Sequence, residues 1–185
     1  MNKKTLFAAA AVVLTLAACK EKKASQDIIV SKPEAFKPEA PIRMKEQLNS
    51  RDVKWLGSLY TVVTHRTAQD SLPKVKDAMG QSYVDNSVLL TISRSDGSVF
   101  FSRTFTKSSF SSYLNDDYRR NGILEALVFD DVDDGQLEFA VSVSRPDSDD
   151  EFIPLEMKVD RNGGLTIRRD DQMDTSGDDD DDDDD

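Results

Sequence analysis

The chain contains one histidine and one cysteine, which limits the chemistry that its side chains can perform. Neither a disulfide within the chain nor a metal site of Cys and His ligands can be built from one residue of each type. His65 lies near the end of a β-branched stretch, and the sequence holds no Gly-x-Ser-x-Gly motif or catalytic cysteine to act with it. We interpret His65 as a strand residue at a rim, and we predict no catalytic residue, no metal site and no cofactor.

Residues 130–135 read Asp-Asp-Val-Asp-Asp-Gly, which is close to a calcium-binding loop. An EF-hand needs an oxygen ligand at the third position, where this chain has Val132, and a bidentate glutamate at the twelfth, where it has Val141. We therefore interpret the segment as an acidic hairpin turn.

The last eight residues are all aspartate. Neighbouring charges lie within one Debye length of about 8 Å, so they repel one another and keep the segment extended. We predict a disordered acidic tail over residues 171–185 that increases solubility. Weak and diffuse calcium binding is the alternative, and it would use Asp178, Asp179, Asp180, Asp181, Asp182, Asp183, Asp184 and Asp185.

The N-terminus holds the most specific chemical motif of the chain. Lys3 and Lys4 precede an apolar run over residues 6–16, and a Leu-Ala-Ala-Cys sequence ends at Cys19. The run is too short for a transmembrane helix, which needs about 20 apolar residues. Small residues before a cysteine resemble the lipobox of bacterial lipoproteins. We predict a signal peptide over residues 1–18 and a lipid on the thiol of Cys19.

The residues after Cys19 help to predict on which side of the membrane the anchor lies. Lipoproteins exported to the cell surface in the Bacteroidota resemble one another in an acidic run after the cysteine, whereas this chain reads Lys-Glu-Lys-Lys over residues 20–23. We expect a lipid anchor in the outer membrane, on the periplasmic side rather than at the cell surface. The membrane is thus one expected partner, reached through the lipid.

Residues 19–50 are polar and contain three of the six prolines of the chain. A segment of this composition does not bury enough apolar surface to order itself. We predict a flexible linker, with a short helix over residues 40–50 and a stray edge strand over residues 28–30 as local exceptions.

From residue 51 to residue 170 the apolar pattern changes to the alternation of strands. Phe110, Tyr113 and Leu114 fall at helical spacing and predict one short helix between strands three and four. One-sided alternation implies antiparallel strands, so we predict an all-β antiparallel meander of about seven strands that closes as a barrel or sandwich. The predicted strands, the first with a bulge at Gly57, cover residues 53–66, 83–94, 98–106, 123–130, 136–144, 153–159 and 165–169.

Two loops predict the register of their hairpins. The dipeptide Asp96-Gly97 predicts a two-residue type I′ turn, since both central residues of that turn need a positive φ. A three-residue loop after the strand over residues 153–159 would pair Val159 with Ile167. The turn at Asp96-Gly97 would pair Ile92 with Phe101, Leu90 with Arg103 and Val88 with Phe105.

Seven short motifs carry a family resemblance: Trp55-Leu56-Gly57, Asp70-Ser71-Leu72-Pro73, Tyr83-Val84-Asp85-Asn86, Asp96-Gly97-Ser98-Val99-Phe100-Phe101, Phe105-Thr106-Lys107, Asn121-Gly122-Ile123-Leu124-Glu125 and Ile153-Pro154-Leu155. They resemble a family of Bacteroidota lipoproteins filed as domain of unknown function 4738. The resemblance covers residues 42–170 and the signal peptide. It implies an envelope location and supplies no catalytic residue. Within the second motif, Asp-Ser-Leu also looks like a sequon that Bacteroidota glycosylate, which makes Ser71 a candidate glycosylation site.

Charge and composition narrow the function classes. The formal charge is -11 and no lysine or arginine stripe is present to meet phosphates, so nucleic acid is not an expected partner. We expect a membrane-anchored, non-enzymatic envelope module that binds a protein or glycan. A small-molecule or lipid carrier with a hollow β-barrel is the alternative, because aromatic residues line pockets as well as cores. A hydrolase with two carboxylates about 5–9 Å apart is a third class, which no spacing in the sequence indicates.

Overall fold

The computed structural model of the protein describes residues 40–148 and 150–170. The signal peptide, Cys19, the strand over residues 28–30 and the aspartate tail are predictions that lie outside these residues. Within them, no helix is long and apolar enough to span a bilayer. The described elements are β1 (Ile42–Arg43), β2 (Gln47–Trp55), β3 (Ser58–Ala68), β4 (Val75–Lys76), β5 (Ser82–Val84), β6 (Asn86–Arg94), β7 (Val99–Thr106), the 3₁₀ helix η1 (Lys107–Tyr113), α1 (Asp116–Asn121), β8 (Ile123–Asp133), β9 (Gln136–Ser144), β10 (Phe152–Val159) and β11 (Leu165–Arg169).

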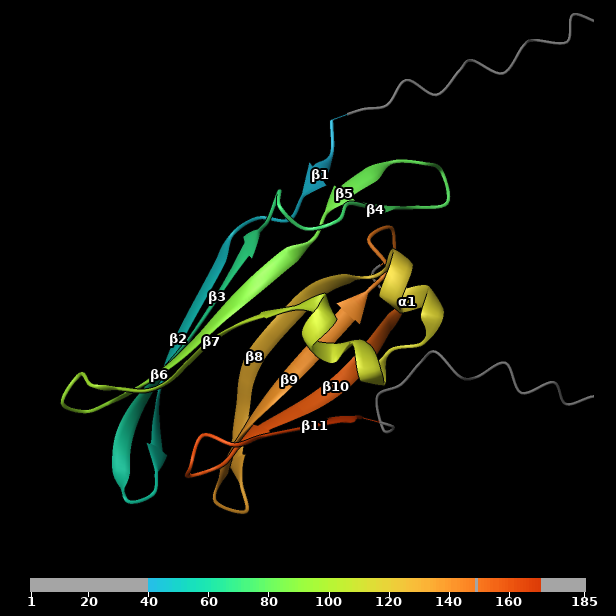
Figure 1. The fold of residues 1–185 in the computed structure, drawn as a ribbon. Helices are drawn as coiled ribbons and strands as arrows, with labels where there is room; N and C mark the ends of the chain where they lie inside the picture. The colour runs from blue at the N-terminus through green and yellow to red at the C-terminus, as the bar shows by residue number, and fades with distance from the viewer. Residues whose placement is uncertain (1–39, 149, 171–185) are drawn as a thin grey trace, which may run out of the picture. The chain divides into compact units, whose positions relative to one another are not determined.

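Eight of these strands form two antiparallel sheets of four (Figure 1). The first sheet has the order β2-β3-β6-β7 and the second the order β11-β10-β9-β8. A small third sheet joins β1, β5 and β4, and β1 runs parallel to β5 in it. The predicted mainly antiparallel β class is confirmed. A closed barrel is wrong, because no strand ladder joins the two large sheets within the described residues.

The interior between the large sheets is filled by side chains from both of them. The alternation predicted for β9 and β10 is confirmed, since its apolar members are buried: Leu137, Phe139, Val141, Val143, Ile153, Leu155, Met157 and Val159. They form one hydrophobic cluster with Val62, Val88, Leu90 and Ile92 of the first sheet. Burial of these side chains is the main force that holds the two layers together.

The first predicted strand is two strands joined by a tight turn. Leu56 and Gly57 have φ values of 51° and 78°, so they form the turn between β2 and β3, and the predicted bulge at Gly57 is wrong. The predicted helix over residues 40–50 is also wrong, because β2 begins at Gln47. Residues 47–52 are exposed, and an exposed strand without apolar alternation gives no strand signal in the sequence.

The predicted pairs between β6 and β7 are confirmed, including Ile92 with Phe101 and Val88 with Phe105. The turn itself differs, since only Gly97 has a positive φ and the loop between Arg94 and Ser98 has three residues. Ser93 pairs with Val99 and Ile92 with Phe101, so Phe100 forms a bulge that restores the predicted register.

The register between β10 and β11 is wrong by two residues. Val159 pairs with Leu165, and Met157 pairs with Ile167. A shift of two keeps the same side chains on the same face, so the apolar alternation alone does not distinguish the two registers.

The number of strands and the position of the helix differ from the prediction. Eleven strands are described instead of seven, because two predicted strands are each divided and β1 and β4 are additional. The helical spacing of Phe110 and Tyr113 falls in η1, whereas the α-helix follows as α1. Asn115 caps α1 by accepting a hydrogen bond from the Tyr118 backbone N–H at 3.0 Å.

Candidate functional site

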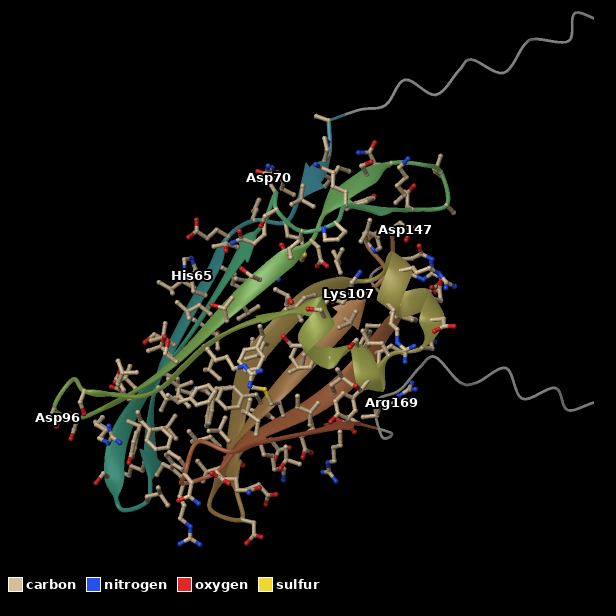
Figure 2. The ribbon with its side chains drawn as sticks, in the orientation of Figure 1. His65, Asp70, Asp96, Lys107, Asp147 and Arg169 are labelled. Atoms are coloured by element: carbon tan, nitrogen blue, oxygen red, sulfur yellow. The ribbon has the colours of Figure 1, made fainter. Side chains whose placement is uncertain are left out.

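A cleft of about 440 Å³ opens where the segment around β4 meets the helical connection between β7 and β8. We call it the cationic cleft, because four of its lining side chains are basic and one is acidic. Its lining residues are Leu72, Pro73, Lys74, Val75, Asp85, Thr106, Lys107, Ser108, Ser111, Leu114, Arg119 and Arg120. Figure 2 labels Lys107, which is the first residue of η1 and directly follows β7.

Asp85 lies in the wall of the cationic cleft and is almost fully buried, with 5% of its side chain exposed. It stands between β5 and β6, where the chain passes from the small sheet to the first large sheet. Its Oδ1 accepts hydrogen bonds from the backbone N–H of Asn86 at 2.8 Å and of Leu124 at 2.9 Å. Two such bonds satisfy a carboxylate that burial would otherwise penalise.

Asp85 and Asn86 together hold the start of β8. While Asp85 accepts from the N–H of Leu124, Nδ2 of Asn86 donates to the Leu124 carbonyl at 2.9 Å. The ladder between β8 and β9 is irregular between Leu124 and Ala126. The two side chains therefore bind the backbone of β8 beside a bulge, and they connect the two large sheets at this end.

Lys107 faces the carboxylate across the same wall. Its Nζ lies 3.7 Å from Oδ2 of Asp85 and donates a hydrogen bond to the Gly122 carbonyl at 2.6 Å. Burial lowers the pKa of Lys107 below its ordinary value, and the charge of Asp85 opposes this effect. The ammonium is thus held by one carboxylate and one carbonyl.

Two other basic residues of the rim come from the last turn of α1. Arg119 is engaged, because its Nε donates to the Ser111 carbonyl and its guanidinium pairs with Asp116, each at 2.8 Å. Within residues 40–148 and 150–170, Arg120 and Lys74 make no hydrogen bond or ion pair, and both are exposed. Arg120 is therefore available to a ligand, and Lys74 makes no direct ion pair although its charge helps to lower the pKa of Asp70.

The six-residue helix α1 is anchored to the core by a buried side chain. Tyr118 is 5% exposed and belongs to the hydrophobic core, and the Arg145 guanidinium lies 5.7 Å from the centre of its ring. Arg145 also pairs with Asp117 at 2.5 Å. The apolar side of α1 is thus anchored, and its arginines are left at the rim.

The residues singled out in the sequence lie apart from one another. Ser71 is exposed in the turn between β3 and β4, next to the cleft residue Leu72. His65, labelled in Figure 2, lies on β3, and its Nε2 contacts Glu46. In the segment over residues 130–135, Asp134-Gly135 form the tight turn between β8 and β9, which confirms the hairpin interpretation. No group of three or more potential metal ligands is found among the described residues.

Sequence reasoning missed Asp85 and Lys107, both of which lie in motifs quoted for the family resemblance. The available signal was Asp85-Asn86 within an otherwise β-branched and apolar run. An aspartate at that place predicts either an interruption of the strand or a buried carboxylate with a partner. Here it is both.

Other parts of the described surface offer less chemistry. A groove of about 490 Å³ lies between β2 and β8, but Arg51 is its one charged lining residue and lies over the Phe129 ring at 5.8 Å. On the second sheet, Glu138 and Glu156 lie 3.3 and 3.4 Å from the ammonium of Lys158. Burial and the neighbouring carboxylate of Glu156 raise the pKa of Glu138. These carboxylates are engaged in an ion network.

Comparison with known proteins identifies one domain family. The family model described as Domain of unknown function (DUF4738) matches residues 27–167, which include every described strand except the last two residues of β11. A search of curated proteins found no match to the chain.

Proposed function

The chain belongs to the family described as Domain of unknown function (DUF4738), and we propose that it is a lipid-tethered, non-enzymatic binding module of the cell envelope. The cationic cleft would be its ligand site. The observation that carries the proposal is this cleft itself, which lies at the edge of the packed core and presents two basic side chains without an ion-pair partner among the described residues.

The arrangement of the core bears on the two alternatives. A carrier with a hollow barrel would need a large apolar cavity inside the core, whereas the core side chains pack against one another and the groove between β2 and β8 is lined largely by polar residues. A carboxylate hydrolase would need an acid and a base free to act on one substrate. Glu138 and Glu156 are instead bound to Lys158, and Glu156 also to Arg168. We therefore favour binding over transport or hydrolysis.

The tether is supported by the sequence around Cys19. Growth with an alkyne-tagged fatty acid should label the wild-type protein and leave Cys19→Ser unlabelled, and that variant should leave the membrane fraction. Lys20→Ser is the matched control and should be labelled like the wild type. Equal labelling of the Cys19 variant would contradict lipidation at this residue.

The expected periplasmic side can be tested on intact cells. Externally added protease should leave the domain uncut until the outer membrane is opened. Loss of the domain from intact cells would contradict the periplasmic placement and leave the binding proposal unaffected.

The ligand site can be tested with two tryptophan substitutions on η1. Ser111 lines the cationic cleft, whereas its neighbour Ser112 is exposed and lies outside the lining. Full-length protein is mixed with an extract of native envelopes, and retained molecules are identified by mass spectrometry. Ser111→Trp should lose retention while Ser112→Trp keeps it. Equal retention by both variants would refute the cleft as the site.

A further inference from the structure

The cationic cleft differs in charge from the chain that contains it. The chain carries a formal charge of -11, yet the described lining contains four basic side chains and a single carboxylate. That carboxylate, Asp85, is engaged with Lys107 and with two backbone N–H groups. The basic excess at the rim is therefore not neutralised by the lining itself.

Two of the four basic residues are already bound to protein groups, and two are not. Lys107 and Arg119 are engaged with protein groups, as described above. Lys74 approaches the cleft from the segment before β4 and Arg120 from the end of α1, and neither has an ion-pair partner among the described residues. Two cations from separate elements thus border one opening, an arrangement that suits an oxyanion between them.

The remaining wall is apolar and of limited size. Leu72, Val75 and Leu114 line it, and Val75 and Leu114 are each 2% exposed. A volume of about 440 Å³ lies within the range of small-molecule sites, which is about 300–1,000 Å³. A ligand that fits would place an apolar body against this wall and its charge at the rim.

We infer that the cationic cleft binds a small molecule that carries an oxyanion, a carboxylate or a phosphate, on an apolar body, and that Lys74 and Arg120 meet its charge. This inference rests on the proposed function and specifies the class of ligand.

The test uses probes that differ in charge at constant shape. Benzoate and phenyl phosphate represent the two oxyanions, and benzamide is the neutral counterpart of benzoate. Equilibrium dialysis against the full-length protein measures each affinity. We expect benzoate or phenyl phosphate to bind at least about tenfold more tightly than benzamide, since a charge-assisted hydrogen bond is worth roughly a factor of ten. Higher salt should weaken the binding of the anions.

Charge variants then assign the residues. Lys74→Gln combined with Arg120→Gln should weaken anion binding about tenfold or more. Lys76→Gln is the matched control, because Lys76 is an exposed residue of β4 outside the lining. The titration is repeated on a chain that ends at residue 177, so that the aspartate tail cannot compete, and anion binding in either form supports the inference.

The outcomes separate this inference from the proposed function. Benzamide binding as tightly as benzoate would overturn the anion specificity, and anion binding unchanged in the double variant would overturn the assignment to Lys74 and Arg120. In both cases the comparison of Ser111→Trp with Ser112→Trp still tests the cleft as the ligand site. Absence of binding by all three probes to both forms of the chain would overturn the inference as well. If Ser111→Trp also retained envelope molecules as well as Ser112→Trp, the proposed function would fail together with it.

Discussion

Replacement of Asp85 should destabilise the domain more than replacement of its ion-pair partner Lys107. Asp85→Ala leaves the backbone N–H groups of Asn86 and Leu124 without their acceptor, and both residues are fully buried. An unsatisfied buried donor costs about 1–3 kcal/mol. The variant also leaves Lys107, whose side chain is 14% exposed, without its counterion. The ammonium keeps its hydrogen bond to the Gly122 carbonyl, so the loss of the counterion adds to the cost of the two unsatisfied donors, about 3–5 kcal/mol in all.

Lys107→Met has a smaller expected cost because the carboxylate keeps both of its backbone hydrogen bonds. We expect Asp85→Ala to lower the free energy of unfolding by about 3–5 kcal/mol and Lys107→Met by about 1–2 kcal/mol. Asp116→Ala is the control, since Asp116 is 74% exposed and should change stability by less than about 1 kcal/mol.

Urea unfolding followed by tryptophan fluorescence measures these differences. Trp55 is the one tryptophan of the chain and is buried, and it pairs with Ser58 at the start of β3. Asn86 pairs with Ala68 at the other end of the same strand. The fluorescence therefore reports unfolding of the whole sheet. If Lys107→Met proved as destabilising as Asp85→Ala, the ion pair would dominate, and the importance assigned to the N–H bonds would be wrong.

Three further predictions concern separate parts of the chain. Hydrogen bonding to Arg43 lowers the pKa of Asp70 below its ordinary value of 3.8, so the stability that this contact contributes is present above that pH and lost as the pH falls through the lower folded-state pKa. Thermal melts should show Asp70→Asn slightly less stable than the wild type at pH 7 and equal to it at pH 2; a constant gap would contradict this. Gly122→Ala should cost about 1–3 kcal/mol in urea unfolding, since a Cβ there would lie 2.8 Å from the Tyr118 carbonyl oxygen, and an unchanged midpoint would show that the neighbours give way. Calorimetric calcium titration should give equal heats with and without residues 178–185, and a larger heat with them would favour the cation-binding alternative.

The hairpin patterns show how far a local sequence signal reaches. Alternation in β9 and β10 predicted which side chains enter the core, because the period of a strand is fixed by its backbone. The same pattern did not distinguish registers two residues apart, as the pairing of Val159 with Leu165 shows. It also missed β2, since residues 47–52 are exposed and carry no apolar period.

The sequence by itself determined the chemistry that one cysteine and one histidine allow, the antiparallel β class and the apolar face of the central strands. These properties depend on residue type and on neighbours a few positions apart. Only the tertiary structure decided that two separate sheets pack together instead of closing as a barrel. It also decided that Asp85 binds the backbone of Leu124, 39 positions along the chain. The cationic cleft combines residues from the segment before β4, the end of β7 and α1, and no local pattern encodes contacts between elements so far apart in sequence.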